Sequence, residues 1–201
     1  MRARLALDAS AQACELREVE LRQKPVEMLQ ASSKGTVPVL VVASGQVIDE
    51  SLDIMLWALH RNDPERWLAP ERDSPEGMLE LIGQFDSHFK SHLDRYKYPN
   101  RFAGVGSLAS RVEACRDLEL LESRLARAAH LGGADVSLVD MAIAPFVRQF
   151  ANVDPAWFAS QPWSALQRWL TRIVTAERFQ RIMRAVPVWV PGTPGVSFPF
   201  R

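Results

Sequence analysis

The segment from Ser33 to Leu59 constrains the fold of this chain most strongly, because it joins a Val-Pro step to a hairpin and a helix start. Proline has no backbone N–H to give to a sheet, so Pro38 is expected at the start or the edge of a strand. Val39–Val42 then form a short predicted strand, and Ser44-Gly45 supplies the turn to a partner strand at Gln46–Ile48. The segment therefore predicts a two-stranded hairpin directly before a helix.

The predicted helix begins at the sequence Asp49-Glu50-Ser51 and runs to about residue 61. The hydroxyl of Ser51 is expected to cap it by accepting a bond from one of the first free N–H groups. These N–H groups carry partial positive charge, so a helix start at the end of a strand is a ready site for an anion. The extended backbone at Val37 is expected beside this site, where the two together can hold a small anionic peptide.

The other N-terminal elements are short, and the chain beyond residue 75 is predicted to be helical. Residues 2–12 form an amphipathic helix, residues 14–21 a strand and residues 25–31 a short helix. A linker rich in proline and charge occupies residues 62–75. Beyond the linker, helices are predicted at residues 76–95, 107–129, 137–151, 163–177 and 179–186. The tail, residues 187–201, is rich in Pro and Gly and is expected to lie extended over the surface.

Composition narrows the class of protein. The chain has 24 Lys and Arg against 24 Asp and Glu, and this zero net charge argues against a nucleic-acid or anionic-membrane partner. No apolar run approaches the roughly 18–20 residues of a membrane span, and Met1-Arg2-Ala3-Arg4 lacks the apolar core of a signal peptide. A cytoplasmic protein is therefore expected. Cys14 and Cys115 form no CxxC motif, and each is predicted to be a small buried hydrophobe.

The order of the Val-Pro step, the hairpin and the Glu-Ser pair resembles that of the glutathione transferase family. In that family the residue before a cis-proline pairs its backbone with the cysteinyl unit of glutathione, and the Glu-Ser pair holds the γ-glutamyl end. A Lys-Pro step like Lys24-Pro25 contacts glutathione in Cys-type, omega-like bacterial members. The resemblance thus implies a cis bond before Pro38 and a glutathione site at Lys24, Val37, Pro38, Glu50 and Ser51.

The resemblance implies an α/β plus all-α fold in two domains. Residues 1–61 would form a thioredoxin-like, glutathione-binding domain that lacks its first strand, and residues 76–201 an α-helical glutathione-transferase domain beyond the linker at 62–75. The absent strand would lie between residues 14–21 and the hairpin, and its loss removes burial worth about 5–10 kcal/mol. Three hypotheses follow: Met1 lies inside a longer protein, the chain is a shortened form stabilised by its helical domain and a dimer partner, or another segment such as residues 196–200 fills the position.

The same absence leaves the catalytic residue unknown. In Cys-type members the nucleophile stands at the end of the first strand, in a C-P-x-[AC] motif, and the chain begins where that motif would end. Cys14 does not match that position. The binding half of a glutathione site therefore persists in this sequence without the family nucleophile.

In the helical part, aromatic and His side chains share one predicted helix, with the sequence FDSHFKSHLDRY. In the family this helix lines the pocket for the electrophile, which implies substrate contacts from Phe85, His88, Phe89 and His92. The alternative for these residues is helix packing together with a solvated face. The two His residues stand four apart, as metal ligands can, but no third ligand accompanies them and no metal is predicted.

Two further patterns lie in the helical part. Ser137 and Asp140 form a capping box before an apolar run, which the resemblance also places at the central helix of the family's C-terminal domain. A basic cluster lies at residues 90–101, where Lys90, Arg95, Lys97 and Arg101 stand beside Tyr96 and Tyr98. Such a cluster can bind nucleic acid, but the zero net charge of the chain argues against this function.

The function implied is glutathione-dependent thiol transfer or conjugation to a small electrophile, carried out in the cytoplasm by a homodimer. The alternative is a non-catalytic glutathione-transferase-like binding or regulatory module. A family isomerase or dehalogenase also stays open, and the sequence does not identify the electrophile.

Overall fold

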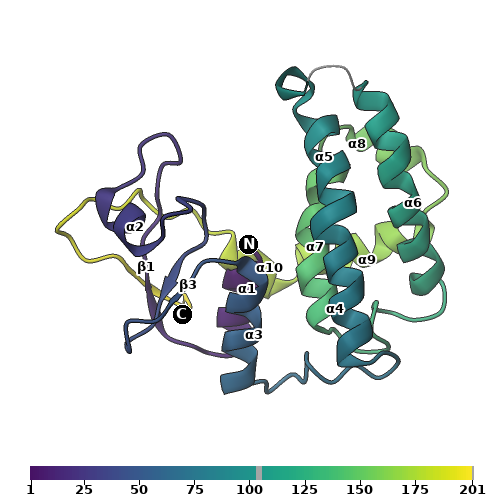
Figure 1. Ribbon diagram of the computed structural model, residues 1–201. Helices are drawn as coiled ribbons and strands as arrows, with labels where there is room; N and C mark the ends of the chain where they lie inside the picture. The colour runs from purple at the N-terminus through teal and green to yellow at the C-terminus, as the bar shows by residue number, and fades with distance from the viewer. Residues whose placement is uncertain (103–105, 201) are drawn as a thin grey trace. The chain divides into compact units, whose positions relative to one another are not determined.

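The computed structural model describes residues 1–102 and 106–200, which form two compact units (Figure 1). Unit 1 combines residues 1–65 with residues 176–200, and unit 2 contains the described residues between 66 and 175. The family resemblance implies that residues 176–200 belong to the helical C-terminal domain. In the structure they cluster with the N-terminal residues.

Unit 1 is an α/β unit with short strands. Its elements are α1 (Arg2–Ala9), β1 (Cys14–Leu16), α2 (Val26–Ala31), β2 (Leu40–Val41), β3 (Val47–Ile48), α3 (Ser51–Arg61), α10 (Glu177–Ile182) and β4 (Val196–Phe198). The predicted hairpin is confirmed: β2 and β3 pair antiparallel, with Leu40 opposite Ile48. Gly45 takes a positive φ of 86° in the turn between them, a conformation that glycine adopts without steric cost.

Helices α1 and α3 pack against each other and supply the core of unit 1. Leu5 and Ala6 of α1 are fully buried, as are Met55 and Ala58 of α3. This apolar seam follows from the spacing of three and four residues between apolar positions on each helix. The seam fixes α3, so it also fixes where the N-terminus of α3 lies within unit 1.

The end of the chain completes the second strand pair of unit 1. Strand β4 pairs antiparallel with β1, with Cys14 opposite Phe198 and Leu16 opposite Val196. Phe198 and Phe200 are buried, and their rings meet edge to face with centroids 5.1 Å apart. The expectation that the whole tail lies over the surface is therefore wrong for residues 196–200. These residues supply the ladder partner of β1, while β2 and β3 form a separate two-stranded pair.

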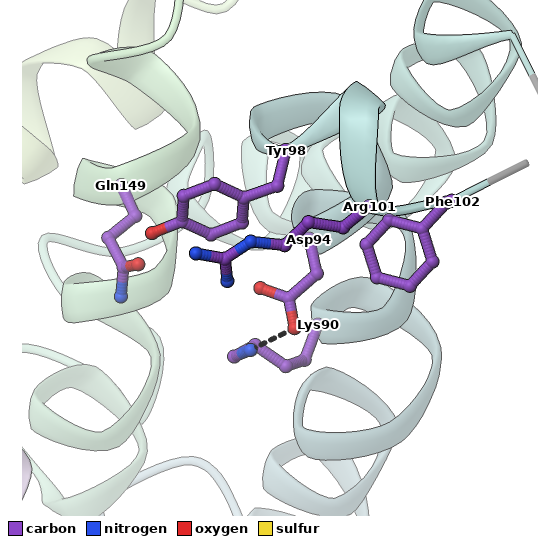
Figure 2. Close-up of a pocket in the computed structure, with 6 residues that line it drawn as sticks. All are labelled: Lys90, Asp94, Tyr98, Arg101, Phe102 and Gln149. Carbon is purple, nitrogen blue, oxygen red and sulfur yellow. Dashed lines mark hydrogen bonds and ion pairs between the residues drawn. The ribbon is translucent and has the colours of Figure 1, made fainter. Parts of the chain in front are cut away.

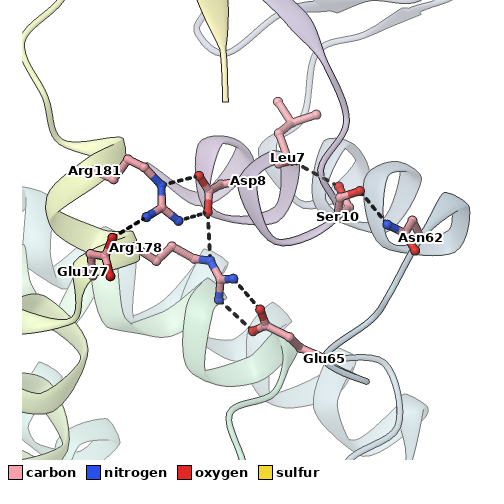
Figure 3. Close-up of polar contacts among 8 residues, drawn as sticks. All are labelled: Leu7, Asp8, Ser10, Asn62, Glu65, Glu177, Arg178 and Arg181. Carbon is pink, nitrogen blue, oxygen red and sulfur yellow. Dashed lines mark hydrogen bonds and ion pairs between the residues drawn. The ribbon is translucent and has the colours of Figure 1, made fainter. Parts of the chain in front are cut away.

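A buried carboxylate ties α1 to α10 within unit 1 (Figure 3). The side chain of Asp8 is 3% exposed and accepts hydrogen bonds from Arg178 at 2.9 Å and from Arg181 at 2.8 and 2.9 Å. Arg178 also donates to Glu65, with one N–O distance of 2.7 Å, and Arg181 pairs with Glu177. Burial alone would raise the pKa of Asp8, but the hydrogen bonds and charges of the two arginines outweigh it and hold this pKa below its usual value.

The regular elements of unit 2, in its described residues, are all helices apart from an isolated β-bridge between His130 and Gly133. Its elements are α4 (Pro75–Gln84), a π-helical turn (Phe85–Phe89), α5 (Lys90–Lys97), a 3₁₀ turn (Pro99–Arg101), α6 (Ser107–Leu125), α7 (Leu138–Ala151), α8 (Pro155–Ser160) and α9 (Ser164–Thr175). Helices α4 and α5 continue into each other through the π-helical turn, so that they form one column in Figure 1. The predicted helix at 76–95 is thus present, but with an extra-wide turn in its middle.

Helix α7 lies at the centre of unit 2, and almost all of its residues are buried. Its predicted capping box is confirmed. The N–H of Ser137 donates to Asp140 at 3.0 Å, and the Ser137 hydroxyl donates to the same carboxylate at 2.7 Å. Trp67, from the predicted linker, is also fully buried and accepts a backbone hydrogen bond from Leu138. The linker is therefore anchored in unit 2 at this tryptophan.

Candidate functional site

The Val37–Pro38 peptide bond of unit 1 is cis, as the resemblance implied. Val37 is 47% exposed, although valine is an apolar residue. Among residues 1–102 and 106–200, no other backbone group bonds to the N–H or C=O of Val37. This backbone is therefore open to pair with an extended ligand, in the way that one strand pairs with another.

The start of α3 also belongs to this candidate site. Glu50 occupies the N-cap position with extended backbone, and Ser51 is the first helical residue. The expected capping by the Ser51 hydroxyl is wrong, because this helix start has no side-chain cap. The Ser51 oxygen instead accepts a hydrogen bond of 3.3 Å from the guanidinium of Arg2. The first N–H groups of α3 thus keep their capacity to bind an anion, with a permanent cation beside them.

An ion-pair cluster surrounds Glu50 on the side of the preceding loop. The ammonium of Lys34 contacts Glu50 at 2.7 Å and Asp49 at 3.1 Å, and the Ser32 hydroxyl donates to Asp49 at 2.7 Å. The hydrogen bond from Ser32, followed by that from Lys34, lowers the pKa of Asp49. The bonds to Glu50 and Asp49 raise the pKa of Lys34. The Asp49 carboxylate and the Lys34 ammonium are therefore charged at neutral pH.

Lys24 is exposed and makes no ion pair among the residues that the structure describes. Its Nζ atom lies over Gly35, 3.8 Å from the position that a Cβ would take there. Because Gly35 and Val37 belong to the same loop, the Lys24 ammonium stands near the open backbone of the Val-Pro step. Its charge is available to a ligand carboxylate.

The sequence predicts Lys24, Val37, Pro38, Glu50 and Ser51 as site residues, but it does not indicate their polar neighbours. Arg2 contacts Ser51 across 49 positions of sequence, and Lys34 contacts Glu50 across 16. Ser32 and Lys34 also bind Asp49, the neighbour of Glu50, across 17 and 15 positions. Sequence patterns within a few residues do not predict contacts between residues that lie so far apart in the chain. The one available signal was the Asp-Glu pair directly before Ser51, which requires a nearby cation or a helix start.

The residues predicted to line an electrophile pocket have two kinds of surroundings in unit 2. Phe85 and Phe89 are fully buried, with ring centroids 4.8 Å apart, and Phe89 lies 5.6 Å from Phe150. In this structure both rings pack in the core. A contact with a substrate therefore stays a prediction for His88 and His92 only.

His88 and His92 belong to a polar cluster between the π-helical turn, α5 and α6. The Nδ1 atom of His88 lies 2.7 Å from the carboxylate of Asp117, which also accepts a hydrogen bond of 2.6 Å from Gln84. The two His rings meet edge to face at 4.6 Å. Burial lowers the pKa of His92, and the nearby His88 and Arg95 lower it further. Among the described residues no group of three or more His, Cys, Asp and Glu side chains could hold a metal ion.

Both cysteines are free thiols and partly buried. Burial raises the pKa of Cys14. Burial and the charge of Glu119 raise the pKa of Cys115 to about 11. Since the thiolate is the nucleophilic form of cysteine, neither residue is activated at neutral pH.

Comparison with known proteins places the chain in a family. The glutathione S-transferase N-terminal domain profile matches residues 1–67, and the glutathione S-transferase C-terminal domain profile matches residues 109–172. These two matches together cover well over half of the chain. The protein belongs to the glutathione S-transferase family, and its fold is the thioredoxin-like N-terminal domain of that family followed by the helical C-terminal domain.

Solved structures of the family share this fold at low sequence identity. BphK, a bacterial glutathione transferase solved as a ternary complex, has a TM-score of 0.75 and 20% identity, covering 90% of this chain and 91% of that chain. The transferase URE2P6 of Phanerochaete chrysosporium, solved with oxidized glutathione, has a TM-score of 0.76 and 16% identity, covering 90% and 88%. A transferase from Rhodospirillum rubrum F11 has a TM-score of 0.74 and 18% identity, covering 97% and 90%. No curated protein sequence matches the chain.

Proposed function

We propose that this chain binds glutathione at the Val37–Pro38 step and the start of α3, and that it transfers or conjugates the glutathione thiol to a small electrophile. The observation that carries the proposal is the exposed, unpaired backbone of Val37 at a cis-proline within a chain of the glutathione S-transferase family. A tripeptide with a carboxylate at each end meets a complementary group at each part of this site.

Each part of glutathione has a proposed partner. The cysteinyl unit pairs with the N–H and C=O of Val37, as an added strand would. The γ-glutamyl carboxylate binds the Ser51 hydroxyl and the first N–H groups of α3, with the Arg2 guanidinium adding charge. The γ-glutamyl ammonium binds Glu50, which then shares its carboxylate with Lys34. The glycine carboxylate binds Lys24.

The proposed chemistry uses the thiol of glutathione as the nucleophile. Its sulfur forms a bond to an electrophilic carbon, or to one sulfur of a disulfide, while the leaving group departs with its electron pair and the thiol proton passes to solvent. The residue that promotes loss of this proton stays unknown. We propose His88 and His92 as contacts of the electrophile, a homodimer as the working assembly and the cytoplasm as its location.

Substitution of Ser51 tests the binding half of the proposal. Ser51→Ala should weaken glutathione binding about tenfold, because a hydrogen bond to a charged group contributes about 1.5–3 kcal/mol. Titration calorimetry with the full chain measures the dissociation constant. Ser44→Ala, in the exposed hairpin turn of the same unit, is the matched control and should bind glutathione as the parent does. If the parent shows no saturable binding of glutathione, the proposed site is wrong.

A non-catalytic binding module is the second candidate, and the raised pKa values of both cysteines favour it. The two candidates differ in turnover and share the binding site. Conjugation of glutathione to an activated aryl chloride, and reduction of a glutathione mixed disulfide, should each be followed with the protein at saturating glutathione. Turnover above the rate without protein supports the transferase. Saturable binding without turnover of either probe supports the module.

A further inference from the structure

Unit 1 contains a large concave site that shares no residue with the glutathione site proposed above. Its volume is about 1120 Å³. Its walls come from the end of α1 with the loop after it, from α10 with the residues that follow it, and from β4 with the residues up to Phe200. All of these elements belong to unit 1. The site is therefore built mainly by the last segment of the chain, which begins with α10.

Both acidic side chains that line this site are already paired. Asp8 accepts hydrogen bonds from Arg178 and Arg181, as Figure 3 shows. Glu177 forms an ion pair with Arg181. A ligand cation would have to displace an arginine from one of these carboxylates. The site therefore does not favour a positively charged ligand.

Arg184 also lines the site, and its charge is not used by a carboxylate. It makes no ion pair within residues 1–102 and 106–200. Its guanidinium carbon lies 5.6 Å from the centroid of the Phe200 ring, a contact that holds the cation at the wall of the site. A guanidinium has five N–H donors and no acceptor. Arg184 therefore offers a planar set of donors to an anion.

One unpaired guanidinium favours an anion of single charge. A carboxylate carries one negative charge and matches the guanidinium through two parallel hydrogen bonds. A phosphate monoester carries about −1.5 to −2 at pH 7. Its second charge would stand near Asp8 and Glu177 with no cation left to balance it. The charges of the lining therefore select a carboxylate over a phosphate.

The apolar wall of the site is mainly aliphatic where a ligand can reach it. The aliphatic lining side chains that are exposed or half-buried include Val186, Pro187, Val196 and Pro199. Phe198 and Phe200 are buried, with ring centroids 5.1 Å apart, so their rings offer little open face for stacking. The volume exceeds the roughly 300–1,000 Å³ of ordinary small-molecule pockets, which leaves room for a long chain.

We propose that this site binds a long-chain aliphatic monocarboxylate. The carboxylate binds the Arg184 guanidinium, and the chain lies along the aliphatic wall at residues 186–187 and 196–199, from which it displaces water. Burying one CH₂ group completely strengthens association about fourfold. The affinity should therefore rise with the length of the chain.

Dodecanoate is the probe for this proposal, titrated into the full chain without glutathione and below the concentration at which it forms micelles. Amide chemical shifts measure the binding and locate it. Dodecanoate should saturate the protein below about 1 mM. Octanoate should bind at least about tenfold more weakly, because it has four fewer CH₂ groups to bury. Dodecylammonium, which reverses the charge, should also bind more weakly. The shifted amides should include those of residues 184–186 and 196–198.

Arg184→Gln should weaken dodecanoate binding about tenfold or more, because it removes a charge-assisted contact. Arg101→Gln is the matched control. Arg101 is another exposed arginine over an aromatic ring, with its guanidinium carbon 4.3 Å from the centroid of Tyr98 in a small pocket of unit 2 (Figure 2). This control variant should bind dodecanoate as the parent does.

Four results would each overturn the proposal. They are a failure of dodecanoate to saturate by about 1 mM, equal binding of octanoate or dodecylammonium, equal weakening by the two variants, and amide shifts confined to residues outside 184–200. Glutathione is absent from all of these titrations. A failure here is therefore distinguishable from a failure of the proposed glutathione site.

Discussion

Replacing Asp140 with alanine should lower the free energy of unfolding of unit 2 by about 3–5 kcal/mol. The Asp140 carboxylate is fully buried and accepts four hydrogen bonds: from the Leu131 N–H at 2.8 Å, the Trp169 indole N–H at 2.8 Å, and the N–H and hydroxyl of Ser137. Alanine would leave these donors without an acceptor. Each buried donor left unsatisfied costs about 1–3 kcal/mol, and the site also loses volume.

Chemical denaturation followed by tryptophan fluorescence measures this loss. Asp154→Ala is the matched control, because Asp154 caps α8 through one hydrogen bond to the Trp157 N–H and should cost only about 1 kcal/mol. Ser137→Ala keeps the Asp140 carboxylate and removes one of its four donors, so its loss of stability should lie between those of the other two variants. This variant tests the same network if Asp140→Ala does not fold. Equal losses for Asp140→Ala and Asp154→Ala would show that the buried network contributes little.

Replacing Asp8 with asparagine should lower the free energy of unfolding of unit 1 by about 2–4 kcal/mol. The change removes the charge that both Arg178 and Arg181 share, at a side chain that is 3% exposed. The expected loss is smaller than for Asp140, because Arg178 keeps Glu65 and Arg181 keeps Glu177 as partners. Glu20→Gln, at an exposed carboxylate of the same unit, should change stability very little and serves as the control.

The loss of stability caused by Asp8→Asn should become smaller at acidic pH. The pKa of Asp8 is lower in the folded protein than its ordinary value of 3.8, so the unfolded chain binds the proton more readily. The stability that Asp8 contributes is therefore fully present above pH 3.8 and is lost as the pH falls through the lower folded pKa. The difference in unfolding midpoint between the parent and Asp8→Asn should stay constant from pH 6 to about pH 4 and should shrink as the pH falls from there to pH 3. A difference that stays constant down to pH 3 would contradict the assigned ion pairs.

Local patterns in the sequence predicted the parts of the fold that depend on nearby residues. The hairpin turn at Gly45, the helix Ser51–Arg61 and the capping box at Ser137 each follow from turn, capping or periodicity signals within a few residues. Helix α8 was missed although Asp154 and Pro155 stand at its N-cap and first position, which is a recognisable start signal. The wide turn at Phe85–Phe89 has no such signal, because its sequence continues the helical pattern.

Contacts between distant residues account for what sequence analysis did not predict at the candidate site and in unit 1. Arg2 reaches Ser51 across 49 positions, and Asp8 reaches Arg178 across 170. From the sequence, the position of residues 196–200 is one hypothesis among three, because the pairing of β4 with β1 requires a register that no local motif sets. The predicted glutathione residues came from the family resemblance, and their polar neighbours came only from the structure.

The pairing of β1 with β4 sets an order for folding during synthesis. Unit 2 is one continuous stretch, so the ribosome has delivered all of it once residue 175 has emerged. Cys14–Leu16 emerge early but must wait for Val196–Phe198 before their ladder can form. The helical unit can thus fold on the growing chain while the unit with the candidate glutathione site is still incomplete. A nascent chain stalled after residue 175 should therefore carry a folded helical unit and should not yet hold glutathione tightly.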